Sequence, residues 1–190
     1  MKKIGGFLDL ELLKPHYFSD SKALLLSTGR ACLNLIFNKV NPKKIYIPYY
    51  TCDSVLEPVL FNKIKFQYYS INKNLDPEIV NINDGEYFYY INYFGLKSRM
   101  IQKLIKTYGE NLIIDNTQAF YENGYKNIWS YNSARKFFGV SDGAYLFSPI
   151  DLKNDFKRNT KISYKHLIDS NRQSGYESFL NNESLLSLKI

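Results

Sequence analysis

The chain has 190 residues, of which 45% are hydrophobic and 23% charged, as in one soluble globular domain with a full-sized core. Its net charge of +7 comes from basic residues that are scattered along the chain. No basic run of five or six residues and no helix-turn-helix or RNA-binding signature accompanies that charge, so a nucleic-acid partner is disfavoured.

Other compositional features disfavour metal-binding, secreted and membrane proteins. The chain has only two histidines, and its two cysteines, Cys32 and Cys52, lack CxxC spacing, so we expect no metal site and reduced thiols. No apolar run approaches the length of a membrane span, and residues 1–6 lack the apolar core of a signal peptide. We therefore expect a cytoplasmic protein without a membrane partner.

The hydrophobic pattern predicts strands that alternate with helices. Apolar residues with helical spacing follow Gly29 and predict a helix there, and further helices are expected over 51–63 and 97–108. Pro58 is expected to end or kink the first of these two, and Pro77 to start a single helical turn in a polar loop. Strands are expected at 44–48, 64–69, 86–94, 111–115, 127–131 and 144–148.

This alternation predicts an α/β fold with a mostly parallel, mixed sheet covered by helices. We place that domain at residues 1–150. Residues 151–190 are polar and predict a helical extension or linker rather than a second domain with its own core.

One acid and one lysine carry the strongest chemical signal. The apolar run Leu112-Ile113-Ile114 ends on Asp115, and Lys136 follows one further strand-like segment. This order fits a pyridoxal phosphate (PLP) site, in which the acid keeps the pyridine nitrogen protonated and the lysine binds the aldehyde covalently. Taken singly, the acid is equally a loop residue or helix cap, and the lysine a surface residue. Ser133 with Lys136 also makes a Ser-x-x-Lys pattern, although the rest of the acyl-hydrolase signature is absent.

Five blocks in order carry a family resemblance. The blocks are Ser27-Thr28-Gly29-Arg30-Ala31-Cys32-Leu33, Ile47-Pro48-Tyr49-Tyr50-Thr51-Cys52, Tyr90-Ile91-Asn92-Tyr93-Phe94-Gly95, Ile114-Asp115-Asn116-Thr117-Gln118-Ala119, and Lys136 followed by Asp142-Gly143. With these blocks the chain resembles the DegT/DnrJ/EryC1/StrS family of PLP-dependent sugar aminotransferases over roughly residues 4–190.

The resemblance implies roles for individual residues. Gly29, Arg30 and Ala31 would open a helix whose amides face the cofactor phosphate, and Gln118 would contact the ring hydroxyl. An ordinary strand-to-helix turn explains the glycine equally well. The sequence also departs from the family. Cys52 stands where an aromatic usually stacks on the ring, so Tyr49 or Tyr50 would have to replace it. Tyr131 stands where a serine contacts the phosphate, so Ser133 or Ser130 would supply that contact.

The implied protein is the large domain of a fold-type-I PLP-dependent transferase. It would move an amino group from an amino acid, with glutamate as the expected donor, to a keto sugar nucleotide, and would act as a homodimer. Lys136 would anchor the cofactor and carry the proton. Family members continue into a smaller C-terminal domain, which leads us to expect weak turnover from these 190 residues. Two alternatives stay open: a truncated, non-catalytic relative that keeps the fold, and a basic module that binds an anionic polymer.

Overall fold

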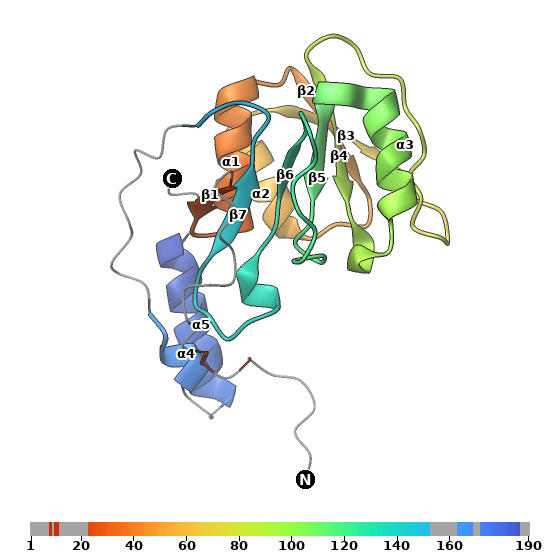
Figure 1. Cartoon of the computed structure of the whole chain (residues 1–190). Coiled ribbons are helices and arrows are strands. Elements are labelled where there is room, and N and C mark those ends of the chain that lie inside the picture. The colour runs from red at the N-terminus through yellow and green to blue at the C-terminus, as the bar shows by residue number, and fades with distance from the viewer. Residues whose placement is uncertain (1–7, 9, 12–22, 153–162, 169–171, 187–190) are drawn as a thin grey trace.

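A computed structural model describes residues 8, 10–11, 23–152, 163–168 and 172–186 of the chain. Its centre is a seven-stranded sheet in the order β1-β7-β6-β5-β4-β2-β3 (Figure 1). Strand β7 runs antiparallel to both of its neighbours, and the other pairs are parallel. The predicted mixed, mostly parallel sheet is therefore confirmed. The strands are β1 (Ala23–Leu26), β2 (Lys44–Pro48), β3 (Lys65–Tyr69), β4 (Glu86–Ile91), β5 (Leu112–Asp115), β6 (Trp129–Tyr131) and β7 (Ala144–Phe147).

The middle of the sheet is buried on both faces. Every residue of β5 and of β6 is buried, as are the last four residues of β4. Parallel strands covered on both sides read as continuous apolar runs, which explains the sequences LIID and EYFYYI. At the edge of the sheet, by contrast, the first three residues of β3 are exposed. The core thus fixes the strand ends at which polar side chains emerge.

Helices α1 (Gly29–Val40) and α3 (Ser98–Tyr108) cover different strands. Thr28 caps α1 by accepting the amide of Ala31 at 3.1 Å, and Asn41 ends it in a left-handed conformation. Helix α1 packs on β1, β6 and β7, while α3 packs on β5 through the apolar stripe of Ile101, Leu104 and Tyr108. The start of α1 is thereby held beside the end of β6.

Three local predictions were wrong. Helix α2 (Asp53–Phe61) continues past Pro58, because Pro58 is buried with Val55 and Val59 on the face that packs inward. That burial outweighs the loss of one helical hydrogen bond. Pro77 itself forms an isolated bridge with Ile71, and no helical turn follows it at residues 78–80. The fourth strand stops at Ile91 and a 3₁₀ turn, Tyr93–Gly95, follows it.

The C-terminal part contributes α4 (Lys165–Ile168) and α5 (Arg172–Leu186), which pack side by side (Figure 1). Both lie within the predicted polar helical extension; residues 153–162 fall outside the described part of the chain, and the predicted boundary at residue 150 stays a prediction. None of the helices in the described ranges is both long and apolar enough to cross a bilayer.

Candidate functional site

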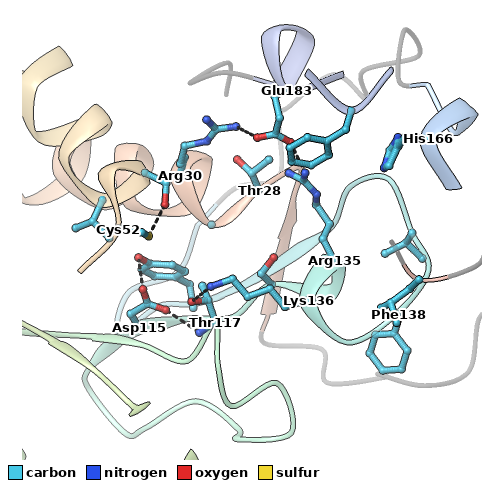
Figure 2. Close-up of a pocket in the computed structure, with 18 of the residues that line it drawn as sticks. Thr28, Arg30, Cys52, Asp115, Thr117, Arg135, Lys136, Phe138, His166 and Glu183 are labelled. Carbon is cyan, nitrogen blue, oxygen red and sulfur yellow. Dashed lines mark hydrogen bonds and ion pairs between the residues drawn. The ribbon is translucent and has the colours of Figure 1, made fainter. Parts of the chain in front are cut away.

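A cavity of about 510 Å³ opens where α1 begins and where β5 and β6 end (Figure 2). Residues far apart in sequence line it, from Leu8 to Glu183. Ligands of open α/β sheets bind beyond the carboxyl ends of the strands, and this cavity lies there. Its polar lining has two parts: an acid end around Asp115 and an arginine end around Arg30 and Arg135.

The acid end is built on Asp115, the last residue of β5, which is only 4% exposed. Its Oδ2 accepts hydrogen bonds from the hydroxyls of Tyr89 (2.5 Å) and Tyr131 (3.3 Å), and its Oδ1 accepts the amide of Thr117 (2.6 Å). The two tyrosines come from the neighbouring strands β4 and β6, so the sheet itself positions every side-chain donor. An ionised carboxylate in a buried site needs such donors, and here it has three.

Burial keeps the two phenols in their donor form. Tyr89 and Tyr131 have pKa values well above the ordinary phenol value, first because they are buried and next because the negative charge of Asp115 opposes a second negative charge. The hydroxyls also lie 2.8 Å from each other. Both groups therefore remain neutral donors to the carboxylate over the physiological pH range.

Thr117 links the acid to the lysine. Its amide binds Asp115, and its Oγ1 accepts a hydrogen bond from Lys136 Nζ at 3.0 Å (Figure 2). Lys136 ends a short 3₁₀ turn, Ala134–Lys136, that follows β6. The side chain of Lys136 thus enters the cavity from one element while Thr117 enters from another. The predicted acid–lysine pair shares one cavity through this intermediate residue.

The start of α1 packs tightly on the acid end. A Cβ atom at Gly29 would lie 3.1 Å from a ring carbon of Tyr131 and 3.3 Å from Cγ2 of Thr117. Helix geometry leaves the amides of Gly29 and Arg30 without partners inside the helix, and the helix dipole makes that end positive. Glycine therefore brings an electropositive helix end to the wall of the cavity.

The arginine end is held by ion pairs. Arg30 pairs with Glu57 of α2 at 2.7 Å and with Glu183 of α5 at 2.7 Å, and the second carboxylate oxygen of Glu183 pairs with Arg135. Buried His166 lines the same wall, and its pKa is lowered by burial and then by the charge of Arg135. Two guanidinium groups thus face the cavity, with one carboxylate bridging them.

Comparison with solved structures identifies proteins that share this fold. The chain matches the sugar aminotransferase CalS13 from Micromonospora echinospora with a TM-score of 0.52 and 13% identity, over 68% of this chain and 42% of CalS13. The fold is that of the sugar aminotransferases. The match to the E. coli GDP-4-keto-6-deoxy-D-mannose-3-dehydratase with bound hydrated PLP has a TM-score of 0.51 and 15% identity, over 67% and 39%.

The fold of the chain also matches an aminotransferase that is named for an amino acid. Tyrosine aminotransferase from Leishmania infantum matches with a TM-score of 0.54 and 12% identity, over 69% of this chain and 40% of the enzyme. The chain therefore spans less than half of the length of each of these three proteins. No family model matches the sequence, and no curated protein matches it either.

Within this aminotransferase fold, most of the predicted site residues lie together. Those that line the cavity are Gly29, Arg30, Asp115, Ser133 and Lys136. Ala31 and Gln118 do not line it: the amide of Ala31 is used in the helix cap, and the Oε1 of Gln118 accepts the amide of Phe94 at 3.2 Å. Their proposed cofactor contacts stay predictions.

The sequence resemblance predicts that Cys52 stands where an aromatic residue would stack on a cofactor ring. Cys52 lines the cavity, and its sulfur lies 2.8 Å from the hydroxyl of Ser54. Tyr49 stacks on Tyr68 and Tyr50 on Tyr93, with ring centroids 4.6 and 5.7 Å apart, and neither tyrosine lines the cavity. Within the described residues, no three His, Cys, Asp or Glu side chains gather as a metal site would require.

Sequence reasoning missed three residues of the site: Thr117 and Glu183 line the cavity, and Tyr89 holds Asp115. Thr117 stands two residues after Asp115, and a hydroxyl so close to the acid was the available signal. Tyr89 gave no signal, because it belongs to a run of aromatic residues that reads as core. Glu183 gave none either, since it lies in a polar helix 153 residues from Arg30.

Proposed function

We propose that this cavity binds PLP and that the chain transfers an amino group from an amino acid to a keto sugar nucleotide. The observation that carries the proposal is the pair of Asp115 and Lys136 in one cavity, joined through Thr117. Neighbours of the same fold include a sugar aminotransferase and a protein with bound PLP. The amino acid, the sugar nucleotide and the whole reaction are proposals for this chain.

The acid end fits a protonated pyridine nitrogen. A carboxylate offers about four acceptor positions, and Asp115 uses three of them for Tyr89, Tyr131 and Thr117. One position therefore remains for a donor from the cavity. A charged N–H there would gain a charge-assisted hydrogen bond in a buried site, where such bonds are strongest. The acid would hold the ring nitrogen protonated through that bond.

The start of α1 fits the phosphate. The amides of Gly29 and Arg30 are free of intrahelical partners by geometry, and anions bind readily at such a helix end. Thr28 and Ser133 line the same cavity and add two hydroxyl groups. We assign the phosphate to these residues. They would replace the serine that contacts the phosphate in the resembled family, where this chain has Tyr131.

Lys136 is the residue that would move protons. When bound, PLP supplies an aldehyde that takes up amino groups and a ring that draws electron density from the amino acid Cα. The Nζ of Lys136 would first hold the cofactor and would be freed when the donor amine takes its place. It would then accept the Cα proton and return it to C4′ of the cofactor. One lysine can serve as both base and acid because the two positions are close together. The hydroxyl of Thr117, which Nζ contacts, would hold the released amine near both positions.

We further propose that a second copy of the chain covers the carboxyl edge of the sheet. Four large side chains are exposed in the loops that follow β2, β4 and β5: Tyr49 (68%), Tyr50 (59%), Phe94 (61%) and Tyr121 (70%). Aromatic residues are enriched in protein interfaces, so these four suit a homodimer. Light scattering should report twice the mass of one chain, and a monodisperse monomer with bound cofactor would contradict the dimer.

Absorbance tests the proposed function. The purified chain incubated with PLP should show the visible band of lysine-bound PLP, and Lys136→Ala should show only the spectrum of the free cofactor. Lys126→Ala, in the loop before β6, is the matched control and should retain the band. A wild-type chain without the band would refute PLP binding. A chain that binds the cofactor but transfers no amino group to any keto sugar nucleotide would be the non-catalytic relative.

A further inference from the structure

Arg30 and Arg135 form the second charged feature of the cavity, and the PLP proposal does not require both of them. We propose that the two arginines form a carboxylate-binding subsite, in which Glu183 and a ligand carboxylate compete for the same contacts. This inference rests on the proposed function, since it names the group of the amino-acid donor that the same cavity would bind.

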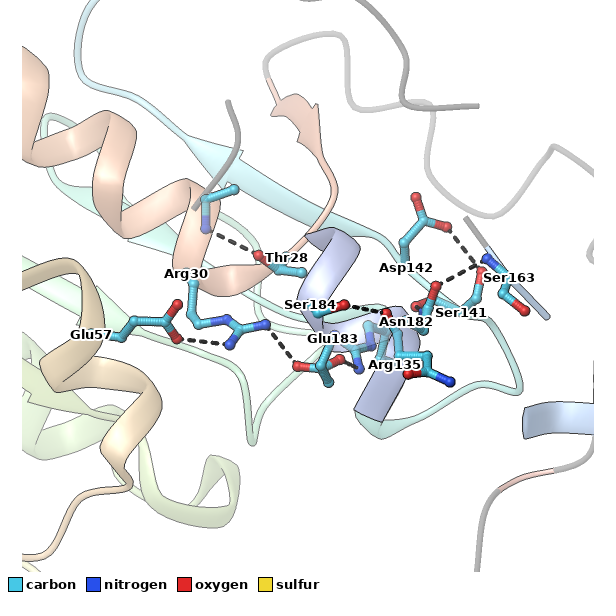
Figure 3. A network of polar contacts seen from close by, with 12 residues as sticks. Thr28, Arg30, Glu57, Arg135, Ser141, Asp142, Ser163, Asn182, Glu183 and Ser184 are labelled. Atoms are coloured by element: carbon cyan, nitrogen blue, oxygen red, sulfur yellow. Dashed lines mark hydrogen bonds and ion pairs between the residues drawn. The ribbon is translucent and has the colours of Figure 1, made fainter. Parts of the chain in front are cut away.

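The geometry of Glu183 shows how a carboxylate binds there. Its Oε2 accepts a hydrogen bond from Arg30 at 2.7 Å, and its Oε1 accepts one from Arg135 (Figure 3). Each carboxylate oxygen thus contacts one guanidinium group. The side chains of Arg30, Arg135 and Glu183 are 15%, 16% and 24% exposed, so water screens these pairs only in part. Such a site recognises a carboxylate strongly, and all three side chains line the cavity.

Charge balance favours a carboxylate over other anions. Glu57 stays paired with Arg30 when Glu183 leaves, so the site then carries one uncompensated positive charge. One ligand carboxylate group restores the original balance at the two arginines, because it makes the contacts that Glu183 made and leaves no arginine unpaired. A phosphate dianion would place both of its charges at the arginines and leave an excess negative charge beside Glu57.

Asn182, the residue before Glu183, attaches α5 to two other segments of the chain. Asn182 donates to the carbonyl oxygen of Ser141 at 3.2 Å and accepts the amide of Ser163 at 3.0 Å, as Figure 3 shows. Leu186 is buried, and the ring of Phe179 lies 5.7 Å from the guanidinium of Arg135. A helix held in this way can withdraw one side chain without unfolding the sheet, since its contacts are separate from the strand pairing.

The subsite lies beside the catalytic lysine. Arg135 and Lys136 are consecutive residues of one 3₁₀ turn, and both line the cavity. Figure 2 shows Lys136 reaching toward Thr117 while Arg135 reaches toward Glu183. An amino acid whose carboxylate bridges the arginines would therefore share the cavity with the amine of Lys136. The acid end of the cavity would then hold PLP, and the arginine end would hold the amino-acid donor.

Titration calorimetry with glutarate, in buffers without PLP, tests the subsite. Glu183→Gln removes the internal competitor, so we expect it to bind glutarate about tenfold more tightly than wild type does. Glu177→Gln changes an exposed carboxylate of the same helix and should match wild type. Adding Arg135→Gln to Glu183→Gln should abolish the gain. Equal affinity in the Glu183 and Glu177 variants would overturn the proposal, and so would inorganic phosphate binding Glu183→Gln more tightly than glutarate does.

Hydrogen exchange on the wild-type chain gives a test that does not depend on the folding of a variant. Saturating glutarate should speed the exchange of α5 amides and leave those of β5 unchanged. Slower or unchanged exchange of α5 would contradict the displacement of Glu183. The glutarate experiments contain no PLP, so they test the subsite independently of the proposed function. A chain that binds glutarate but shows no PLP band would support the subsite and refute the proposed function. A chain that shows the PLP band but does not bind glutarate would refute the subsite alone.

Discussion

The two ends of the cavity hold charge by different means. At the acid end, neutral donors from β4, β6 and the backbone hold Asp115, and its side-chain partners lie within 26 residues of it. At the arginine end, Glu183 reaches across 48 residues to Arg135 and 153 residues to Arg30. Paired strands fix the first arrangement, while a peripheral helix supplies the second. We therefore expect the acid end to be rigid and the arginine end to be exchangeable.

Asp115→Asn should break the acid end most severely. An amide cannot stabilise a protonated pyridine as a carboxylate does, so the single-turnover rate with an amino-acid donor should fall by about 10²–10³-fold. Asp84→Asn, at a fully exposed position, is the control and should leave the rate unchanged. An Asp115→Asn rate within about threefold of wild type would remove Asp115 from the chemistry.

Tyr89→Phe tests how far the sheet supports the acid. It removes the shorter of the two phenol contacts, 2.5 Å against 3.3 Å, from a buried carboxylate. We expect the free energy of unfolding to drop by about 1–3 kcal/mol in urea titrations. Tyr131→Phe, which removes the longer contact, should cost less. The reverse order would show that the contact of Tyr89 is not the main support of Asp115.

Thr117→Val tests the link between acid and lysine. The substitution keeps the shape and the amide that binds Asp115, and it removes the hydroxyl that accepts Lys136 Nζ. The apparent affinity for PLP should fall by about three- to tenfold, the cost of one ordinary hydrogen bond. Thr107→Val, on the exposed side of α3, should bind as wild type does. Equal affinity in both variants would make Thr117 a spacer only.

Glu183→Gln should have the smallest effect on stability. Its ion pairs are partly exposed, and such pairs contribute roughly 0–1 kcal/mol to the free energy of unfolding. The same urea titration should therefore show a smaller loss than Tyr89→Phe causes. A larger loss for Glu183→Gln than for Tyr89→Phe would mean that α5 stabilises the fold as much as β4 does. The arginine end would then be no more exchangeable than the acid end.

The sequence revealed the elements whose pattern is local. The strand over 44–48 was predicted with its observed bounds, and the predicted strand 111–115 begins one residue later in the structure. Asp115 and Lys136 could be predicted to share a site because an acid at a strand end followed by a lysine fits a PLP site.

Contacts that depend on side-chain direction or on distant helices could not be predicted. Gln118 stands in the expected block, yet its amide turns to Phe94, and no sequence pattern specifies that orientation. The pairing of Arg30 with Glu183 depends on how α5 docks, which a polar helix with little apolar periodicity does not encode locally. Pro58 shows the same limit, since tertiary packing decided where α2 ends.

Peptide mapping after borohydride reduction tests the central claim most directly. The chain is incubated with PLP, reduced, digested and analysed by mass spectrometry, so that any lysine that held the cofactor carries a pyridoxyl group. The account predicts that group on Lys136, with Lys126 and the other lysines unmodified. A pyridoxyl group on another lysine, or on none, would contradict the assignment of this cavity as a PLP site.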